Sequence, residues 1–152
     1  LLLTKPLGSG VLLAGAMRGL TAPGDLDACL ASLERSNATA ARVLAEFPVS
    51  AQTDVTGFGL AGHLAEMLRG GGLRARVDLG ALPLLPGALA LAERGVTSSL
   101  YAQNARLAPA IHLAGVKADE ARRALVFDPQ TSGGLLAAAG VPAALIGAVL
   151  PL

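Results

Sequence analysis

Three short segments rich in glycine and hydroxyl side chains carry the residues of this sequence that could do chemistry. The most informative is Thr-Asp-Val-Thr-Gly-Phe-Gly-Leu at 53–60, which places one carboxylate, Asp54, just before a helical pattern. Glycine lets backbone approach a ligand closely, N–H groups at a helix start attract anions, and a carboxylate can hold a divalent cation. These are the requirements for binding a metal-bound phosphate.

Two other segments have similar chemistry. They are Leu-Thr-Lys-Pro-Leu-Gly-Ser-Gly at 3–10 and Asp-Pro-Gln-Thr-Ser-Gly-Gly-Leu-Leu at 128–136. We call 3–10, 53–60 and 128–136 the first, second and third segments. One such segment would be weak support for a ligand site, but three in a chain of 152 residues indicate a site or half of one.

Asp54 is the candidate metal ligand of the second segment. Magnesium prefers one or two carboxylates, completed by phosphate oxygens and water. The alternative for Asp54 is a helix N-cap, a role that aspartate also fills well. Thr53, Thr56, Gly57 and Gly59 could shape the loop around the ion, with or without touching the ligand.

The first and third segments offer candidates for anion binding. Lys5 could reach a phosphate or another anion, although a lysine before a proline is more typical of a solvated strand end. Thr131, Ser132, Gly133 and Gly134 could offer hydroxyl and backbone donors to an anion. The alternative for these four residues is a tight turn that packs against the other two segments.

The remaining polar residues are interpreted as structural. Asp128 is expected to cap the turn of the third segment and not to be catalytic. Cys29 is the only cysteine, which excludes a disulfide framework and a thiolate zinc site, and its helical context predicts a buried thiol. His63 and His112 are too few for a histidine-rich metal site. His63 and Glu66 lie off the apolar stripe of their helix, so we expect both to be solvated.

The composition excludes some classes of function. The chain is 53% hydrophobic, only 3% aromatic, and has a net charge of +1, so it offers neither a basic surface nor a stacking platform for nucleic acid. Charged residues make up only 15%, which indicates that part of the surface is covered by another domain or chain.

A membrane segment needs consideration because the mean hydropathy is +0.57. Residues 133–152 carry no charge, and a run of that length could cross a bilayer. Repeated glycine and proline within the run favour a strand–turn–strand tail instead. The N-terminus lacks the pattern of a signal peptide, so we expect no membrane insertion and a cytoplasmic location.

The pattern of apolar residues and turn signals predicts an α+β fold. The expected strands cover 1–3, 49–55 and 73–79, and the expected helices cover 25–47, 58–69, 87–94 and 119–125. Glycines 70–72 should end the second helix. Residues 96–111 appear irregular in pattern, with Asn104 and Arg106 as polar fixtures.

Asn37 interrupts the apolar stripe of the long expected helix 25–47. One interpretation is a hydrogen-bonded amide in the core, and the other is a polar contact to a neighbouring loop. We favour the core amide.

Together the three segments resemble the C-terminal half of selenophosphate synthetase (selenide, water dikinase), in the aminoimidazole ribonucleotide synthetase-like superfamily. Their order and approximate spacing match that family, and the resemblance extends to Leu-Pro-Leu-Leu-Pro-Gly-Ala at 82–88 and Glu-Ala-Arg-Arg-Ala-Leu at 120–125. The resemblance implies a C-terminal domain with a mixed sheet packed with helices. It also implies an enzyme that converts ATP, selenide and water to selenophosphate, AMP and phosphate. Selenophosphate is the selenium donor for selenocysteine and modified tRNA.

The resemblance also implies cofactors, partners and site residues. The family enzyme is a two-domain homodimer that requires magnesium, with ATP as substrate. The family's metal-binding aspartate falls on Asp54. The implied phosphate-site residues are Thr53, Thr56, Gly57, Thr131, Ser132 and Gly133.

The N-terminal half of the family enzyme is absent from this sequence. That half carries the reactive cysteine or selenocysteine, a lysine and further metal-binding aspartates, so Cys29 does not take the thiol's role. We expect residues 1–152 to be one domain that pairs with an N-terminal domain of the same chain and is inactive alone. No catalytic residue is expected on it, apart from the candidate Lys5.

The tail after Leu136 is shorter than in the family. Either a helix is deleted, or residues are missing from the sequence, which we favour. Two other functions remain open. The chain could be an inactive binding or dimerisation module of the same fold, or it could belong to a related ATP-dependent enzyme with another substrate.

Overall fold

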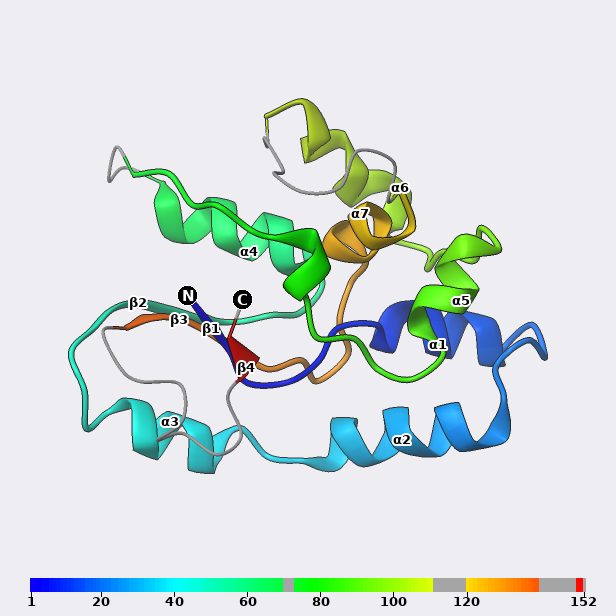
Figure 1. Cartoon of the computed structure of the whole chain (residues 1–152), viewed down its shortest axis with the longest axis horizontal. Coiled ribbons are helices and arrows are strands. Elements are labelled where there is room, and N and C mark those ends of the chain that lie inside the picture. Colours follow the sequence, from blue (N-terminus) through cyan, green and yellow to red (C-terminus); the bar gives the residue numbers. More distant parts are fainter. Residues whose placement is uncertain (70–72, 111–119, 140–149, 152) are drawn as a thin grey trace.

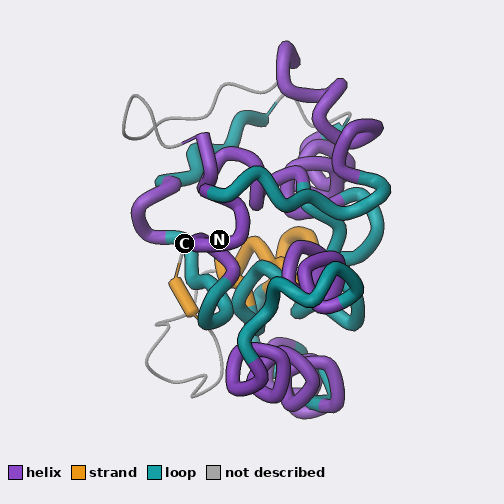
Figure 2. Tube along the Cα trace, turned by 90° about the vertical axis from the view of Figure 1, so that its right-hand side faces the viewer, coloured by secondary structure: helices purple, strands orange, loops and turns teal. Residues whose placement is uncertain are grey.

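The protein is an α+β structure in which helices lie on both sides of a small sheet (Figure 1). The computed structural model describes residues 1–69, 73–110, 120–139 and 150–151. The view turned by 90° shows the strands between helices above and helices below (Figure 2). The predicted α+β class is confirmed.

The sheet has four strands in the order β2-β3-β1-β4. Their bounds are β1 (Leu2–Leu3), β2 (Val49–Asp54), β3 (Leu135–Ala139) and β4 (Leu150–Pro151). Each pairing in this described ladder is antiparallel, where the resemblance implied a mixed sheet. A parallel pairing occurs as the isolated bridge between Leu7 and Leu84. The register places Asp54 opposite Leu135, so the end of β2 lies beside the start of β3.

The helices connect and cover these strands. The α-helices are α1 (Ser9–Ala16), α2 (Pro23–Glu34), α3 (Ala38–Leu44), α4 (Gly59–Leu68), α5 (Ala88–Glu93), α6 (Tyr101–Asn104) and α7 (Glu120–Phe127), and the 3₁₀ helices are η1 (Leu79–Ala81) and η2 (Ala105–Ala110). The predicted strand 49–55 and the predicted helices 58–69, 87–94 and 119–125 are confirmed within a few residues. Residues 101–110, which we expected to be irregular, are helical.

Both faces of the sheet are buried. Leu3 and Leu136 face the cluster that contains Leu60 of α4 and Phe127 of α7. Their strand neighbours Leu2, Leu135 and Ala137 face the other way and pack with Ala40 and Leu44 of α3. Alternate side chains of a strand point to opposite faces, so short, wholly apolar strands suit a sheet between two helical layers.

A third cluster joins α1, α2 and α5 around the fully buried Cys29, which confirms the predicted buried thiol.

The single helix predicted over 25–47 is wrong. It ends at Glu34, Arg35 is extended with φ −67° and ψ 117°, and a new helix begins at Ala38. Asn37 explains the break because its Nδ2 donates to the Gly133 carbonyl at 2.9 Å. The favoured core amide is therefore wrong as well, and the loop contact is what the structure has. A tertiary hydrogen bond overrides the continuous apolar stripe here.

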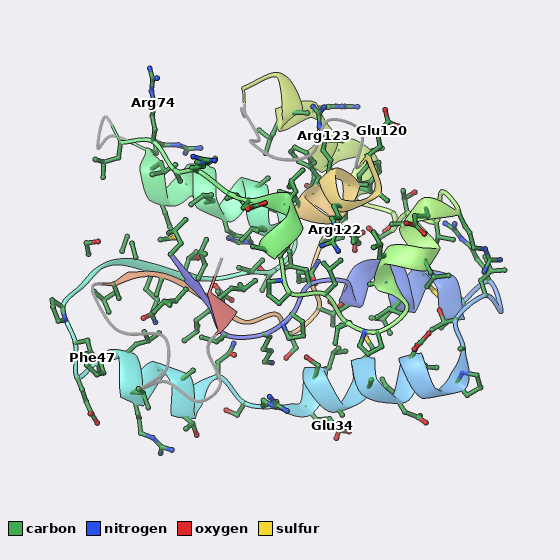
Figure 3. All side chains as sticks on the ribbon, viewed as in Figure 1. Glu34, Phe47, Arg74, Glu120, Arg122 and Arg123 are labelled. Atoms are coloured by element: carbon green, nitrogen blue, oxygen red, sulfur yellow. The ribbon has the colours of Figure 1, made fainter. Side chains whose placement is uncertain are left out.

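The strand predicted over 73–79 is not assigned as one in the structure. Residues 73–77 have no regular secondary structure, Asp78 forms a single β-bridge, and η1 begins at Leu79. Val77 and Leu79 are buried against the core, while Arg74 and Arg76 are exposed, and Arg74 points away from the body of the molecule (Figure 3). An extended segment lying on a core produces the same alternation as a strand. Glycines 70–72, His112 and most of the tail after 139 lie outside the described residues.

No helix in the described ranges is both long enough and apolar enough to cross a membrane.

Candidate functional site

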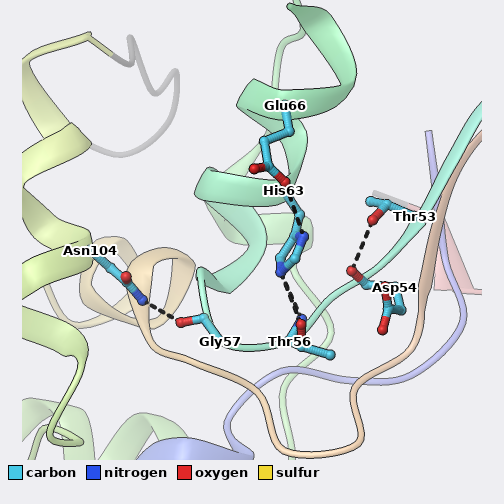
Figure 4. Close-up of polar contacts among 7 residues, drawn as sticks. All are labelled: Thr53, Asp54, Thr56, Gly57, His63, Glu66 and Asn104. Carbon is cyan, nitrogen blue, oxygen red and sulfur yellow. Dashed lines mark hydrogen bonds and ion pairs between the residues drawn. The ribbon is translucent and has the colours of Figure 1, made fainter.

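Asp54 is the last residue of β2 and its carboxylate is exposed. The strand alternates, with Ser50, Gln52 and Asp54 exposed on one face and the residues between them half-buried. No hydrogen bond or ion pair joins the Asp54 carboxylate to another described residue; its backbone carbonyl accepts from Thr53 Oγ1 at 3.2 Å (Figure 4). The N-cap alternative for Asp54 is wrong, because Phe58 occupies the N-cap position of α4 and no side chain caps this helix.

The turn after Asp54, residues 55–58, is fixed through its backbone. Val55 N–H donates to Gly134 O at 2.8 Å. Thr56 O accepts from Gln130 N at 2.9 Å and from Gly59 N at 3.0 Å. Gly59 has φ +68°, and a Cβ there would come within 2.9 Å of the backbone at the end of α7. The third segment and α7 thus hold the second segment closely.

His63 of α4 is buried and contacts this turn, so the prediction that it is solvated is wrong. Its Nε2 accepts from Thr56 N–H at 3.0 Å and lies 3.2 Å from Thr56 Oγ1. A backbone N–H can only donate, so Nε2 must be the acceptor and the proton of the neutral ring sits on Nδ1. Nδ1 lies 3.7 Å from Glu66 Oε2, and Glu66 is exposed as predicted. Helical side chains lean toward the N-terminus, which carries His63 back over the turn.

The third segment caps α1. Asp128 Oδ2 accepts from Val11 N–H at 2.7 Å, and Gln130 Oε1 accepts from Gly8 N–H at 2.9 Å and Ser9 N–H at 3.2 Å. The first N–H groups of a helix have no partner within the helix, so these two side chains satisfy donors that would otherwise be buried and unpaired. We expected Asp128 to cap the turn of the third segment. Instead, it caps the start of α1. Sequence reasoning missed Gln130.

Burial dominates the chemistry of Asp128. The side chain is 2% exposed, and desolvation raises the pKa of its carboxyl to about 6. The nearby Ser98 and the hydrogen bond from Val11 N–H favour the charged form and limit that rise in pKa. Oδ1 of Asp128 and Oγ of Ser98 are both buried without a hydrogen bond of good geometry. This carboxyl is therefore close to its titration point near neutral pH.

The rest of the third segment is a turn bonded to its neighbours. Thr131 N–H donates to Ser9 Oγ at 2.8 Å, and Ser132 Oγ donates to Leu33 O at 2.8 Å. Gly133 has no room for a side chain, because a Cβ would collide with the Val55 carbonyl oxygen. The packed turn that we gave as the alternative is thus present. Anion binding by Thr131 and Ser132, both exposed, stays a prediction.

Lys5 joins the first segment to the third. It is only 3% exposed, and its Nζ donates to Ser132 O at 2.7 Å, so the solvated strand end is wrong. Burial, with a smaller contribution from the Arg35 charge, lowers the pKa of the Lys5 ammonium. The structure thus brings all three segments together, through Lys5 with Ser132 and through Val55 with Gly134.

At the end of β2, Asp54 is the carboxylate that could bind a metal. No group of three or more histidine, cysteine, aspartate or glutamate side chains among them could hold an ion. An exposed, unpaired Asp54 at a strand end suits magnesium, which takes one or two carboxylates and fills its other positions with water and phosphate oxygens. It does not suit zinc, which needs three or four protein ligands.

Comparison with known proteins identifies the family of this chain. Residues 1–151 match the family described as AIR synthase related protein, C-terminal domain. The chain is 38% identical over 137 residues to a selenide, water dikinase of Treponema denticola, covering 90% of this chain and 38% of that protein. It is 42% identical over 138 residues to the enzyme of that name from Geobacter metallireducens, covering 90% and 39%. It is 44% identical over 138 residues to that from Escherichia coli O157:H7, covering 91% and 39%.

The chain therefore spans about two fifths of the length of the curated relatives it matches. These relatives carry the name that the three segments indicated from sequence. The chain belongs to the family of AIR synthase related protein C-terminal domains, on the branch whose relatives are selenophosphate synthetases.

Proposed function

We propose that this chain is the C-terminal domain of a selenophosphate synthetase that uses ATP and water to phosphorylate selenide. The observation that carries the proposal is the exposed, unpaired Asp54 carboxylate at the end of β2. It lies beside the turn 55–58, which contains Thr56 and Gly57. The match to relatives named selenide, water dikinase supplies the substrate class.

Asp54 is the residue that would hold magnesium in this proposal. A magnesium ion held by Asp54 would supply positive charge that neutralises the phosphates of ATP during phosphoryl transfer. Thr53, Thr56 and Gly57 shape the same loop, and Thr131, Ser132 and Gly133 lie on the third segment, which is bonded to that loop. Lys5 keeps a positive charge near the junction of the segments while its ammonium is bonded to Ser132 O.

The rest of the machinery is assigned to a domain outside this chain. We propose that residues 1–152 form one domain, inactive alone, that works with an N-terminal domain in a cytoplasmic homodimer. The spans of the matched relatives support this, because the chain covers only 38–39% of each. The low share of charged residues also suits a surface covered by another domain.

The experiment uses the longer protein that contains this chain, with ATP, magnesium and selenide. We expect AMP, phosphate and selenophosphate, followed by ³¹P NMR, and we expect Asp54→Asn to abolish selenide-dependent ATP consumption while leaving the circular dichroism spectrum unchanged. Asp27→Asn is the matched control, because Asp27 is an exposed carboxylate on α2.

Three outcomes would contradict the proposal in different ways. Near-normal turnover by Asp54→Asn would remove the metal assignment. Formation of ADP in place of AMP would indicate a related ATP-dependent enzyme with another substrate. Absence of any selenide-dependent ATP consumption by the wild-type protein would indicate a binding or dimerisation module.

A further inference from the structure

The turn after Asp54 is held by two buried side chains that arrive from different helices. His63 comes from α4 and Asn104 is the last residue of α6 (Figure 4). Their exposed fractions are 6% and 5%. Neither residue has a role in the function proposed above.

His63 and Asn104 bind neighbouring backbone groups. His63 Nε2 accepts from Thr56 N–H at 3.0 Å, and Asn104 Nδ2 donates to Gly57 O at 2.8 Å. The second N–H of the same amide donates to Phe127 O at 3.0 Å, which anchors Asn104 on the end of α7. The two contacts therefore fix the backbone of Thr56 and Gly57 at both ends.

Packing alone would not fix Gly57. It has no side chain, and a Cβ built on it meets nothing within 4 Å. Glycine has the widest backbone freedom of any residue, so this position relies on hydrogen bonds for its order. Asp54, in contrast, is already held by its pairing with Leu135 across the sheet.

The turn 55–58 also has backbone N–H groups without a hydrogen-bond acceptor among the described residues. The N–H groups of Gly57 and Phe58 donate to no other described residue, and α4 lacks a side-chain cap. Consecutive free N–H groups ahead of a helix suit a phosphate oxygen. The Phe58 N–H lies in the same peptide plane as the Gly57 carbonyl that Asn104 holds. The Gly57 N–H follows the Thr56 backbone, which His63 binds at the N–H and Gln130 N binds at the carbonyl.

We propose that His63 and Asn104 are positioning residues, which hold the Thr56–Gly57 backbone in the conformation that binds the phosphates of a metal–nucleotide complex. This inference rests on the function proposed above. It predicts that loosening either contact weakens binding of the metal–nucleotide complex much more than binding of the metal alone, since the Asp54 backbone stays paired in the sheet.

The test uses the full-length protein, a non-hydrolysable ATP analogue and Mn²⁺ as the metal probe. His63→Leu removes the acceptor for Thr56 N–H, whereas His63→Gln places a side-chain oxygen within reach of it. Asn104→Asp removes both donors without changing side-chain size. Thr21→Val is the control, because it deletes a comparable bond, from Thr21 Oγ1 to Leu12 O at 2.7 Å, away from the turn.

Two readouts are needed. Hydrogen exchange of the peptide covering 54–60 reports whether the turn is held, and calorimetric titration reports the affinity for Mn²⁺ alone and with the analogue. We expect His63→Leu and Asn104→Asp to speed exchange and to weaken binding of the complex by roughly tenfold or more, which is typical of residues that support a ligand. We expect His63→Gln to stay within about threefold of the wild type, less than the loss typical of such residues. Thr21→Val should match the wild type in both readouts.

Several results would overturn the positioning role. One is wild-type affinity in His63→Leu and Asn104→Asp, whether or not exchange becomes faster. If His63→Leu fails to fold, His63→Gln decides, because tenfold weaker binding in that variant would contradict an acceptor role. If wild-type protein binds no complex, or if Asp54→Asn binds it as well as wild type does, the proposed function fails first and the positioning role fails with it.

Discussion

The buried carboxyl of Asp128 should make the protein less stable as pH rises from about 4 to about 6, the interval between its unfolded and folded pKa values. Burial raises the pKa of this group from 3.8 to about 6. In that interval the folded state therefore binds more protons than the unfolded state. Stability falls with rising pH wherever the folded state binds more protons, so the contribution is complete below pH ~4 and lost above pH ~6.

The size of the effect follows from the shift in pKa. Each pKa unit corresponds to about 1.4 kcal/mol, so a shift of about two units corresponds to about 3 kcal/mol in the free energy of unfolding. Asp128 is 2% exposed, so solvent screening leaves this figure nearly intact. The opposing influence is the N-terminus of α1, where Val11 N–H binds the carboxylate and favours its charged form.

The assay is urea unfolding at a series of pH values for wild type and Asp128→Asn. Asparagine cannot ionise, yet its oxygen can still accept from Val11 N–H. All other carboxylates cancel in the difference between the two proteins, so that difference should change by about 3 kcal/mol between pH ~4 and ~7, in favour of wild type at low pH. Parallel stability curves would refute the reasoning. A wild type that loses relative stability on acidification would show that capping of α1 outweighs burial.

Three further predictions concern the junction of the segments. Gly133→Ala should lower the free energy of unfolding by about 3 kcal/mol, because the new Cβ would collide with the Val55 carbonyl. Gly57→Ala should change that free energy by less than about 0.5 kcal/mol, because a Cβ there meets no other atom. Urea unfolding measures both. Gln130→Leu should cost about 3 kcal/mol, seen as a lower Tm, since it leaves buried donors at the start of α1 unpaired. Wild type should gain stability relative to Lys5→Met as pH approaches the usual lysine pKa of 10.5, because the folded pKa is lowered and the folded state sheds its proton first. A fall in the stability of wild type relative to Lys5→Met over that pH range would contradict the last prediction.

The sequence pattern correctly predicted the elements in which local propensity and tertiary packing favour the same structure. The strand at 49–54 and the helix at 59–68 follow from apolar periodicity and from the glycines between them. The three segments also come together in the fold, because each occurs at the end or start of a strand of the same sheet. In these cases the same residues satisfy local propensity and tertiary packing.

The failures come from contacts made across long distances in sequence. Asn37 ends a helix early by binding the third segment, and His63 is buried because it satisfies a backbone N–H of the preceding turn. Neither effect changes the apolar pattern. A polar residue on or beside a helical stripe was the available signal in both cases, and it gave no indication of the partner.

The capping of α1 by the third segment has a consequence for how the chain folds during synthesis. Gly8 and Gln130 are 122 residues apart, Val11 and Asp128 are 117 apart, and Lys5 and Ser132 are 127 apart. Within the described residues, β1 pairs only with β3 and β4. Contacts of such high sequence separation slow folding, and a growing chain exposes its early apolar segments until the late ones emerge. The start of α1 therefore remains uncapped until residues 128–130 have been synthesised and have docked against it.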